Sequence, residues 1–99
     1  MNRNQILKII TEHRARLATE FGIKSLALFG SVVRDEATPA SDVDLLVEFD
    51  GRTVGLFHLS RTQHYLESIL GVPKVDLVLR DGIKPALRER ILREAIHVA

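Results

Sequence analysis

The sequence contains no cysteine and no tryptophan, and prolines account for only three of its 99 residues. Because thiolates are missing, the chain can form neither a disulfide nor a structural zinc site of the usual finger type. The lack of cysteine also fits a reducing compartment. An excess of positive charge is absent too, since the formal net charge is +1. This balance argues against a protein that coats DNA or RNA. A nucleotide substrate stays open, because a metal ion can neutralise phosphate.

Long apolar runs are also missing. Near the N-terminus, Lys8, Glu12 and His13 interrupt the apolar residues, so we expect neither a signal peptide nor a membrane span, and by default a cytoplasmic location. The composition, with 45% apolar and 27% charged residues, is typical of a soluble globular protein. A chain of 99 residues fits one domain, here 1–99. Its modest core requires that a large ligand bind near the surface or be shared with a partner.

Helical and strand patterns alternate along the chain. They predict helices over about 5–21, 53–70 and from 85 onwards, strands over 23–29, 43–49 and 75–79, one or two helical turns over 32–36, and a loop over 37–41. We expect Asn4 and Thr53 to cap the two longer helices, and Gly22 and Gly71 to end them. The order α-β-α-β-α-β-α predicts an α/β (α+β-like) architecture, with a small mixed sheet of three strands flanked by helices.

Apolar spacing predicts the inward faces of the helices. These are Ile6, Ile10, His13, Leu17 and Phe21 on the first helix, Leu56, Leu59, Leu66, Ile69 and Leu70 on the longest, and Leu87, Ile91, Leu92, Ala95 and Ile96 on the last. The charged run 88–94 is expected on a solvated face with local ion pairs, or alternatively against an acidic partner. His58, His64 and His97 do not cluster with His13, so we assign them no chemistry.

Asp42 and Asp44 flank Val43 at the start of the second predicted strand. Because side chains alternate along a strand, the two carboxylates share a face, with Cβ atoms about 6–7 Å apart on a rise of about 3.3 Å per residue. Two like charges held so close are unfavourable without a counter-charge. A hard divalent cation supplies one, and oxygen ligands are those that Mg²⁺ prefers. The pair therefore predicts a metal site, with the opposite, apolar face of the strand buried.

Asp76 is a lone acid in the apolar third strand. If that strand pairs beside the second, Asp76 can face Asp42 and Asp44, and three carboxylates on adjacent strands could hold two Mg²⁺ ions. Such a pair of ions stabilises the attacking and leaving oxygens of an in-line phosphoryl displacement. In the alternative, Asp76 forms a salt bridge with Lys74 or Arg80.

Gly30 and Ser31 lie at a strand-to-helix junction. The N-terminus of even a short helix presents free N–H groups, and glycine allows the backbone to approach a phosphate closely. The Ser31 hydroxyl can donate to a phosphate oxygen, and Arg34 could add positive charge. In the alternative, Gly30-Ser31 only ends the strand and caps a helix. Likewise, Arg34 could instead pair with Asp35, Glu36 or a partner protein.

The spacing between these elements is their most specific feature, since ten residues separate Gly30-Ser31 from Asp42-Val43-Asp44. With this spacing, the sequence resembles the nucleotidyltransferase superfamily that includes DNA polymerase β. It resembles specifically the minimal nucleotidyltransferases that serve as antitoxins to HEPN-domain toxins. The resemblance covers essentially the whole chain, and its main segments are 28–37, 41–47, 75–78 and 85–91.

The resemblance implies an enzyme that transfers AMP from ATP to a tyrosine of a HEPN ribonuclease toxin, and so neutralises it. It implies that Asp42 and Asp44 bind two Mg²⁺ ions. By the same resemblance, Asp76 binds the ion nearest the attacking hydroxyl and helps to deprotonate it. Gly30 and Ser31 would hold the triphosphate, and pyrophosphate would leave. The expected assembly is a hetero-oligomer with the toxin, without direct contact to nucleic acid or membrane.

Two other functions stay open at this point. The chain could be a non-catalytic antitoxin that neutralises the toxin by binding alone. It could also transfer a nucleotide to a small molecule, although a chain this short has little material for a closed pocket. The converging carboxylates favour the enzyme, because a protein that acts only by occlusion has no need of them.

Overall fold

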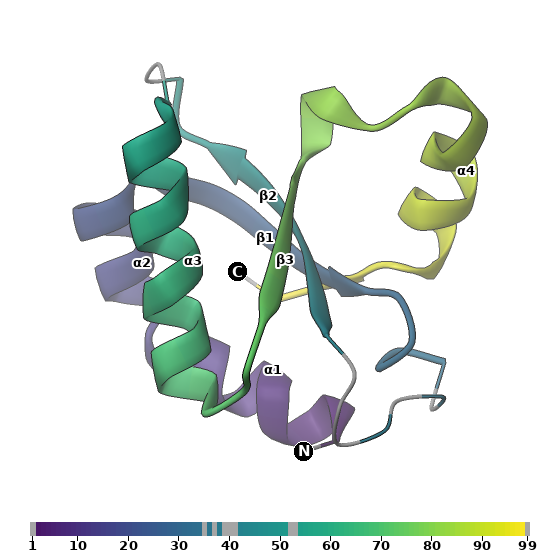
Figure 1. Ribbon diagram of the computed structural model, residues 1–99, viewed down its shortest axis with the longest axis horizontal. Helices are drawn as coiled ribbons and strands as arrows, with labels where there is room; N and C mark the ends of the chain where they lie inside the picture. The colour runs from purple at the N-terminus through teal and green to yellow at the C-terminus, as the bar shows by residue number, and fades with distance from the viewer. Residues whose placement is uncertain (1, 35, 37, 39–41, 52–53, 99) are drawn as a thin grey trace.

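The computed structural model of the chain describes residues 2–34, 36, 38, 42–51 and 54–98. Within these residues, helices and strands alternate much as the sequence predicts (Figure 1). Their bounds are Arg3–Glu12 for α1, Arg14–Phe21 for α2, Ile23–Phe29 for β1, Val43–Phe49 for β2, Leu56–Leu70 for α3, Val75–Leu79 for β3, Arg80–Gly82 for the 3₁₀ turn η1, Pro85–Glu94 for α4 and Ile96–His97 for β4. No helix of this described part is long and apolar enough to cross a membrane.

The described strands form one mixed sheet in the order β3-β2-β1-β4. Strand β2 is antiparallel to β1 and parallel to β3, so the predicted mixed sheet is confirmed, as is the placing of the third strand beside the second. The prediction of three strands is wrong by one. Ile96 pairs with Leu28, and the Val98 N–H donates to the Leu26 carbonyl at 2.8 Å, so β4 supplies hydrogen bonds to the free edge of β1.

The first predicted helix is broken into two at His13, where the backbone leaves the helical range at φ −105° and ψ 6°. Asn2, rather than Asn4, caps α1, in a reciprocal capping box with Gln5. Gly22 ends α2 in the left-handed conformation, as predicted. His13 is half-buried, and its ring lies edge-on to that of Tyr65.

The two faces of the sheet are covered to different extents by helices. Helices α1, α2 and α3 pack on one face, over a core that includes Val43, Leu45 and Val47 of β2, as the sequence predicts. The other face holds a smaller apolar cluster of Phe29, Leu46 and Ile83, against which α4 packs (Figure 1). Since side chains alternate along β2, Asp44 lies on this second, lightly covered face.

The helix ends depart from the predicted apolar faces. Leu56 opens α3 and is 84% exposed, rather than inward as predicted; Thr53, its predicted cap, lies outside the described residues. No residue of α4 is fully buried, and Leu87 and Leu92 are 48% and 37% exposed. The helix stops at Glu94, so Ile96 belongs to a strand rather than to its inward face. Helix α4 therefore packs on the sheet through partly buried side chains, among them Ile91.

Candidate active site

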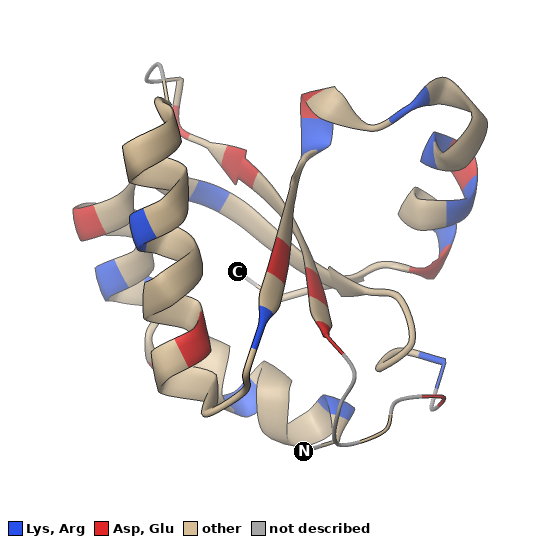
Figure 2. Cartoon of the chain, viewed as in Figure 1, with Lys and Arg blue, Asp and Glu red and all other residues tan. Residues whose placement is uncertain are grey.

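Neighbouring strands place two of the predicted acids side by side. In the parallel register, Val43 pairs with Val75 and Asp44 with Asp76. Figure 2 shows the acidic positions that face each other on β2 and β3. Asp42 lies two residues before Asp44, so its Cβ points toward the same face of the sheet. The sequence argument for Asp76 depended on this strand order.

Asp44 lies in surroundings that disfavour its charged form, first through burial and then through the neighbouring acids. Its side chain is half-buried, and burial raises the pKa of the carboxyl above the ordinary value, with further upward contributions from Asp76 and Asp42. The nearby Arg34 opposes them only in part. A half-buried carboxylate beside two others is a position that a cation would stabilise.

The outer two acids differ in their partners. The Asp42 carboxylate forms an exposed ion pair with Lys74, with Oδ2 and Nζ 3.7 Å apart. Asp76 makes no hydrogen bond or ion pair within the described residues, so the alternative of a salt bridge to Lys74 or Arg80 is not realised there. Asp76 is therefore available to a ligand. Lys74 pairs with Asp42 instead.

Gly30 follows β1 directly and has a left-handed φ of +82°. A Cβ built on this residue would collide with Oδ2 of Asp44 and would lie 2.9 Å from its Cγ. Only glycine combines this backbone conformation with so close an approach of an acidic side chain. The packing thus links the turn after β1 to the acid on β2.

The segment after Gly30 forms hydrogen-bonded turns in place of the short helix predicted over 32–36. The N–H groups of Val33 and Arg34 donate to the Gly30 carbonyl at 3.1 and 3.3 Å, and that of Glu36 donates to the Ser31 carbonyl at 2.9 Å. Among the described residues these are successive turns, not an α-helix, and Asp35 lies outside them. Gly30 does end the strand, but Ser31 does not cap a helix. The Ser31 hydroxyl has no hydrogen-bond partner in the described part of the chain.

Arg34 is occupied by two carboxylates. Its Nε lies 3.2 Å from Glu36 Oε2, which bears out one of the predicted alternatives, and its Nη1 donates to both oxygens of Glu94 at 2.9 and 3.2 Å. These contacts raise the pKa of the guanidinium. Glu94 Oε1 also accepts from the Gly30 N–H at 3.1 Å.

Sequence reasoning missed Glu94. It was expected on a solvated helix face, yet its side chain is only 20% exposed. The two contacts span 60 and 64 residues, and no local spacing marks them. One signal in the sequence could have located Glu94, because it lies at the end of a helix directly before a short apolar segment. If that segment is taken as a strand of the sheet, Glu94 must lie near the sheet.

These groups line a cavity of about 480 Å³ between the sheet and α4. It joins Gly30, Arg34, Asp44 and Asp76 to Glu94; the other lining residues are Phe29, Val78, Gly82, Ile83, Lys84, Leu87, Arg90 and Ile91. Asp42 and Ser31 lie outside its lining. The structure thus brings four of the predicted site residues together around one hollow.

Oxygen donors at this hollow fit a hard cation such as Mg²⁺ in chemistry and in charge. Within the described residues, no three acidic or histidine side chains converge closely enough to hold an ion as they stand. The backbone register aligns Asp44 with Asp76, while Asp42 is turned toward Lys74.

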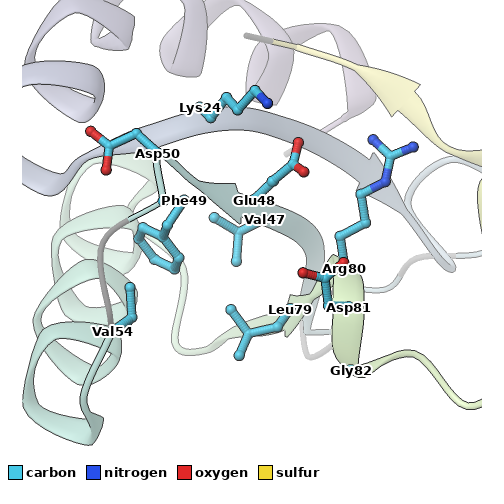
Figure 3. Close-up of a pocket in the computed structure, with 11 residues that line it drawn as sticks. Lys24, Val47, Glu48, Phe49, Asp50, Val54, Leu79, Arg80, Asp81 and Gly82 are labelled. Atoms are coloured by element: carbon cyan, nitrogen blue, oxygen red, sulfur yellow. The ribbon is translucent and has the colours of Figure 1, made fainter.

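A larger cavity, of about 990 Å³, opens at the other end of β2 (Figure 3). Its floor is apolar, with Val47, Phe49 and Leu79 (Figure 3). Its charged lining mixes both signs, with Lys24 and Arg80 among three acids. None of the predicted site residues lines it. Size therefore does not identify the reactive site here, because aligned carboxylates occur only at the smaller cavity of the two.

Comparison with known proteins identifies a matching family and several relatives of the chain. The model of a family described as a nucleotidyltransferase domain matches residues 10–98. The protein adenylyltransferase MntA of Thermococcus cleftensis is 38% identical over 94 residues, which span 95% of this chain and 93% of the relative. A Methanocaldococcus jannaschii protein that is provisionally named a protein adenylyltransferase is 39% identical over 98 residues, or 99% of each chain.

Solved structures show the same fold. One that is provisionally described as a minimal nucleotidyltransferase has a TM-score of 0.76 and 43% identity, and the match covers 97% of this chain and 95% of that one. A toxin–antitoxin structure with AMP-PNP has a TM-score of 0.71 at 22% identity, over all of this chain and 73% of that one. At that identity the second likeness is one of fold alone.

Proposed function

Because the chain belongs to the nucleotidyltransferase domain family, we propose that it transfers AMP from ATP to a tyrosine hydroxyl of a HEPN ribonuclease toxin and thereby neutralises that toxin. The observation that carries the proposal is the pairing of Asp44 with Asp76 on parallel strands, next to Gly30. Relatives that are named protein adenylyltransferases support the choice of a protein as acceptor. The choice of a HEPN toxin as the partner comes from the family resemblance of the sequence, and a toxin–antitoxin structure with the same fold is compatible with it.

Asp42, Asp44 and Asp76 would hold two Mg²⁺ ions in this reaction. When bound, such ions neutralise phosphate charge and favour the ionised form of a hydroxyl. Asp76 lies on the edge side of Asp44 and has no competing partner in the described part of the chain, so it is the acid that we assign to the acceptor hydroxyl. It would take the tyrosine proton as the tyrosine oxygen bonds to the α-phosphorus and the bond to pyrophosphate breaks.

The turn after β1 would hold the triphosphate. The Gly30 N–H and the Arg34 guanidinium point to one place, since both donate to the same oxygen of Glu94. The unpaired Ser31 hydroxyl adjoins them in sequence and could donate to a further phosphate oxygen. A backbone N–H, a hydroxyl and an arginine together make a recurrent set of phosphate donors.

A double substitution of Asp42 and Asp44 to Asn tests the catalytic role. The variant and the wild type would be incubated with Mg²⁺, ATP labelled on the α-phosphate, and a candidate HEPN partner protein. We expect label on a tyrosine of the partner with the wild type and loss of at least about 100-fold with the variant, since removal of groups that act together at a reactive centre is costly. Asp81→Asn, an exposed acid at the other cavity, is the matched control.

An antitoxin that acts by binding alone is the second candidate. Leu56 and Phe57 open α3 with exposed fractions of 84% and 88%, and an exposed apolar pair of this kind favours contact with a protein. Full neutralisation by the Asp42/Asp44 double variant, with the complex intact, would establish binding alone and refute catalysis. Label that appears only on small molecules would instead indicate transfer to a small acceptor.

A further inference from the structure

One carboxylate oxygen accepts hydrogen bonds from two of the groups that we propose as donors to phosphate. Glu94 Oε1 accepts from the Gly30 N–H at 3.1 Å and from Arg34 Nη1 at 2.9 Å, while Oε2 is 3.2 Å from the same Nη1. The contact with the Gly30 N–H is part-buried, whereas the ion pair lies at the surface, with the Arg34 and Glu94 side chains 34% and 20% exposed. Glu94 thus makes the contacts that a phosphate oxygen would make at the turn after β1.

Phosphate and carboxylate compete for such donors, because both are anionic acceptors of charge-assisted hydrogen bonds. They cannot occupy the place together. Glu94 also contributes to the negative charge felt by Asp44. A phosphate that enters beside Glu94 would therefore meet repulsion as well as occupied donors.

Glu94 has a route out of the site. It is the last residue of α4, a helix with no fully buried residue, and its long side chain can swing away by rotation of its own torsions. Ile91 and Ala95 anchor the helix end to the smaller apolar cluster, so α4 itself need not leave. Lys84 and Arg90 line the same cavity and keep it attractive to an anion after the exchange.

We propose that Glu94 is a positioning residue that occupies the phosphate subsite of the nucleotide-free protein and is exchanged for a phosphate of the incoming nucleotide. This inference rests on the proposed function for the identity of the nucleotide. Glu94 holds Arg34 and the Gly30 turn in the donor arrangement until the exchange. Because Glu94 competes for these donors, it also weakens the binding of every phosphate ligand. A ligand with several phosphates and a bound cation makes more contacts, and it therefore displaces Glu94 more readily than a single phosphate does.

The test is the affinity of the purified chain for MgATP and, separately, for magnesium pyrophosphate, measured by calorimetry with Glu94→Gln and Glu94→Ala. Loss of the competing charge should tighten both ligands by about three- to tenfold, which corresponds to the net contribution of one ordinary hydrogen bond. Glu89→Gln on the same helix, with a side chain that is 91% exposed, should leave both affinities unchanged. Unchanged or weaker binding by Glu94→Gln would overturn the inference, because a residue that only steadies Arg34 weakens the site when removed.

A double-mutant cycle separates competition between Glu94 and phosphate from a general loss of order in the site. In an Arg34→Ala background, Glu94 has lost one of its two contacts, and the gain from Glu94→Gln should fall toward unity. A gain that is unchanged in that background would refute exchange at the shared donor. Thermal unfolding of each variant checks that the fold is retained, with Glu94→Gln as the milder change if Glu94→Ala unfolds.

The outcomes also distinguish this inference from the proposed function. Tighter pyrophosphate binding by Glu94→Gln, in a chain that transfers no label to its partner, would uphold the exchange and refute the transfer reaction. Efficient transfer, with affinities that do not respond to Glu94, would uphold the reaction and refute the exchange. If neither ligand binds the wild type or its variants, both fall.

Discussion

Substitution of Gly30 by alanine should damage the fold far more than a usual Gly→Ala change. Two costs add at this position. A residue with a side chain at φ +82° loses roughly 1–2 kcal/mol relative to glycine. The new Cβ would also overlap the Asp44 carboxyl, whose Cγ is 2.9 Å away, and such overpacking costs about 1–3 kcal/mol.

Gly71 provides a matched control. It has a comparable φ of +66°, but a Cβ there meets nothing within 4 Å, so Gly71→Ala carries the conformational cost alone. The difference between the two variants, about 2 kcal/mol, is the contribution of the Asp44 contact. For a domain of this size, it corresponds to a difference in Tm of roughly 8–16 °C.

The measurement is thermal and urea unfolding of the wild type and the two variants under the same conditions. Adding Asp44→Ala to Gly30→Ala should recover most of the excess loss, because it removes the atoms with which the Cβ collides. The reasoning would be refuted if Gly30→Ala and Gly71→Ala destabilised the chain equally. It would also be refuted if removal of the Asp44 side chain gave no recovery.

Two further predictions concern the acids. Because the pKa of Asp44 is raised in the fold, its ionisation opposes folding: stability is lost as the pH rises from the ordinary Asp value, about 3.9, through the folded pKa. Asp44→Asn should therefore have a higher Tm than the wild type at pH 7 and an equal one near pH 3; equal stability at both would contradict the raised pKa. Millimolar Mg²⁺ should raise the Tm of the wild type and not that of the Asp42/Asp44 double variant, and an identical response by scanning calorimetry would exclude a metal ion at this site.

Period-two patterns were the most informative signal in the sequence. The alternation around Val43 predicted a buried apolar face, and Val43, Leu45 and Val47 are buried in the structure; Asp42 precedes β2, so its place on the same face as Asp44 stays a prediction. The position of Asp76 could be stated only as a condition, because strand order is set by pairing between distant segments. The parallel register of β2 and β3 satisfies that condition.

Patterns of helical period were less informative at the ends and breaks of helices. Ile91, Ala95 and Ile96 keep helical spacing past the end of α4, yet the backbone at Ala95 turns extended, with ψ 137°, because the free edge of β1 offers hydrogen bonds to the residues that follow. The break at His13 had no proline or glycine to announce it. Glu94 and β4 could not be predicted for the same reason. Both make their contacts only because the chain after α4 returns to β1.

The pairing of β4 with β1 has a consequence for the order in which the chain is assembled during synthesis. One edge of β1 can be satisfied as soon as β2 has emerged, since the two are neighbours in sequence and in the sheet. The other edge must wait for residues that follow α3, β3 and α4. A nascent chain therefore carries its acidic strands before Glu94 can reach Gly30, and the contact between Glu94 and the turn after β1 forms only when the last part of the described chain has left the ribosome.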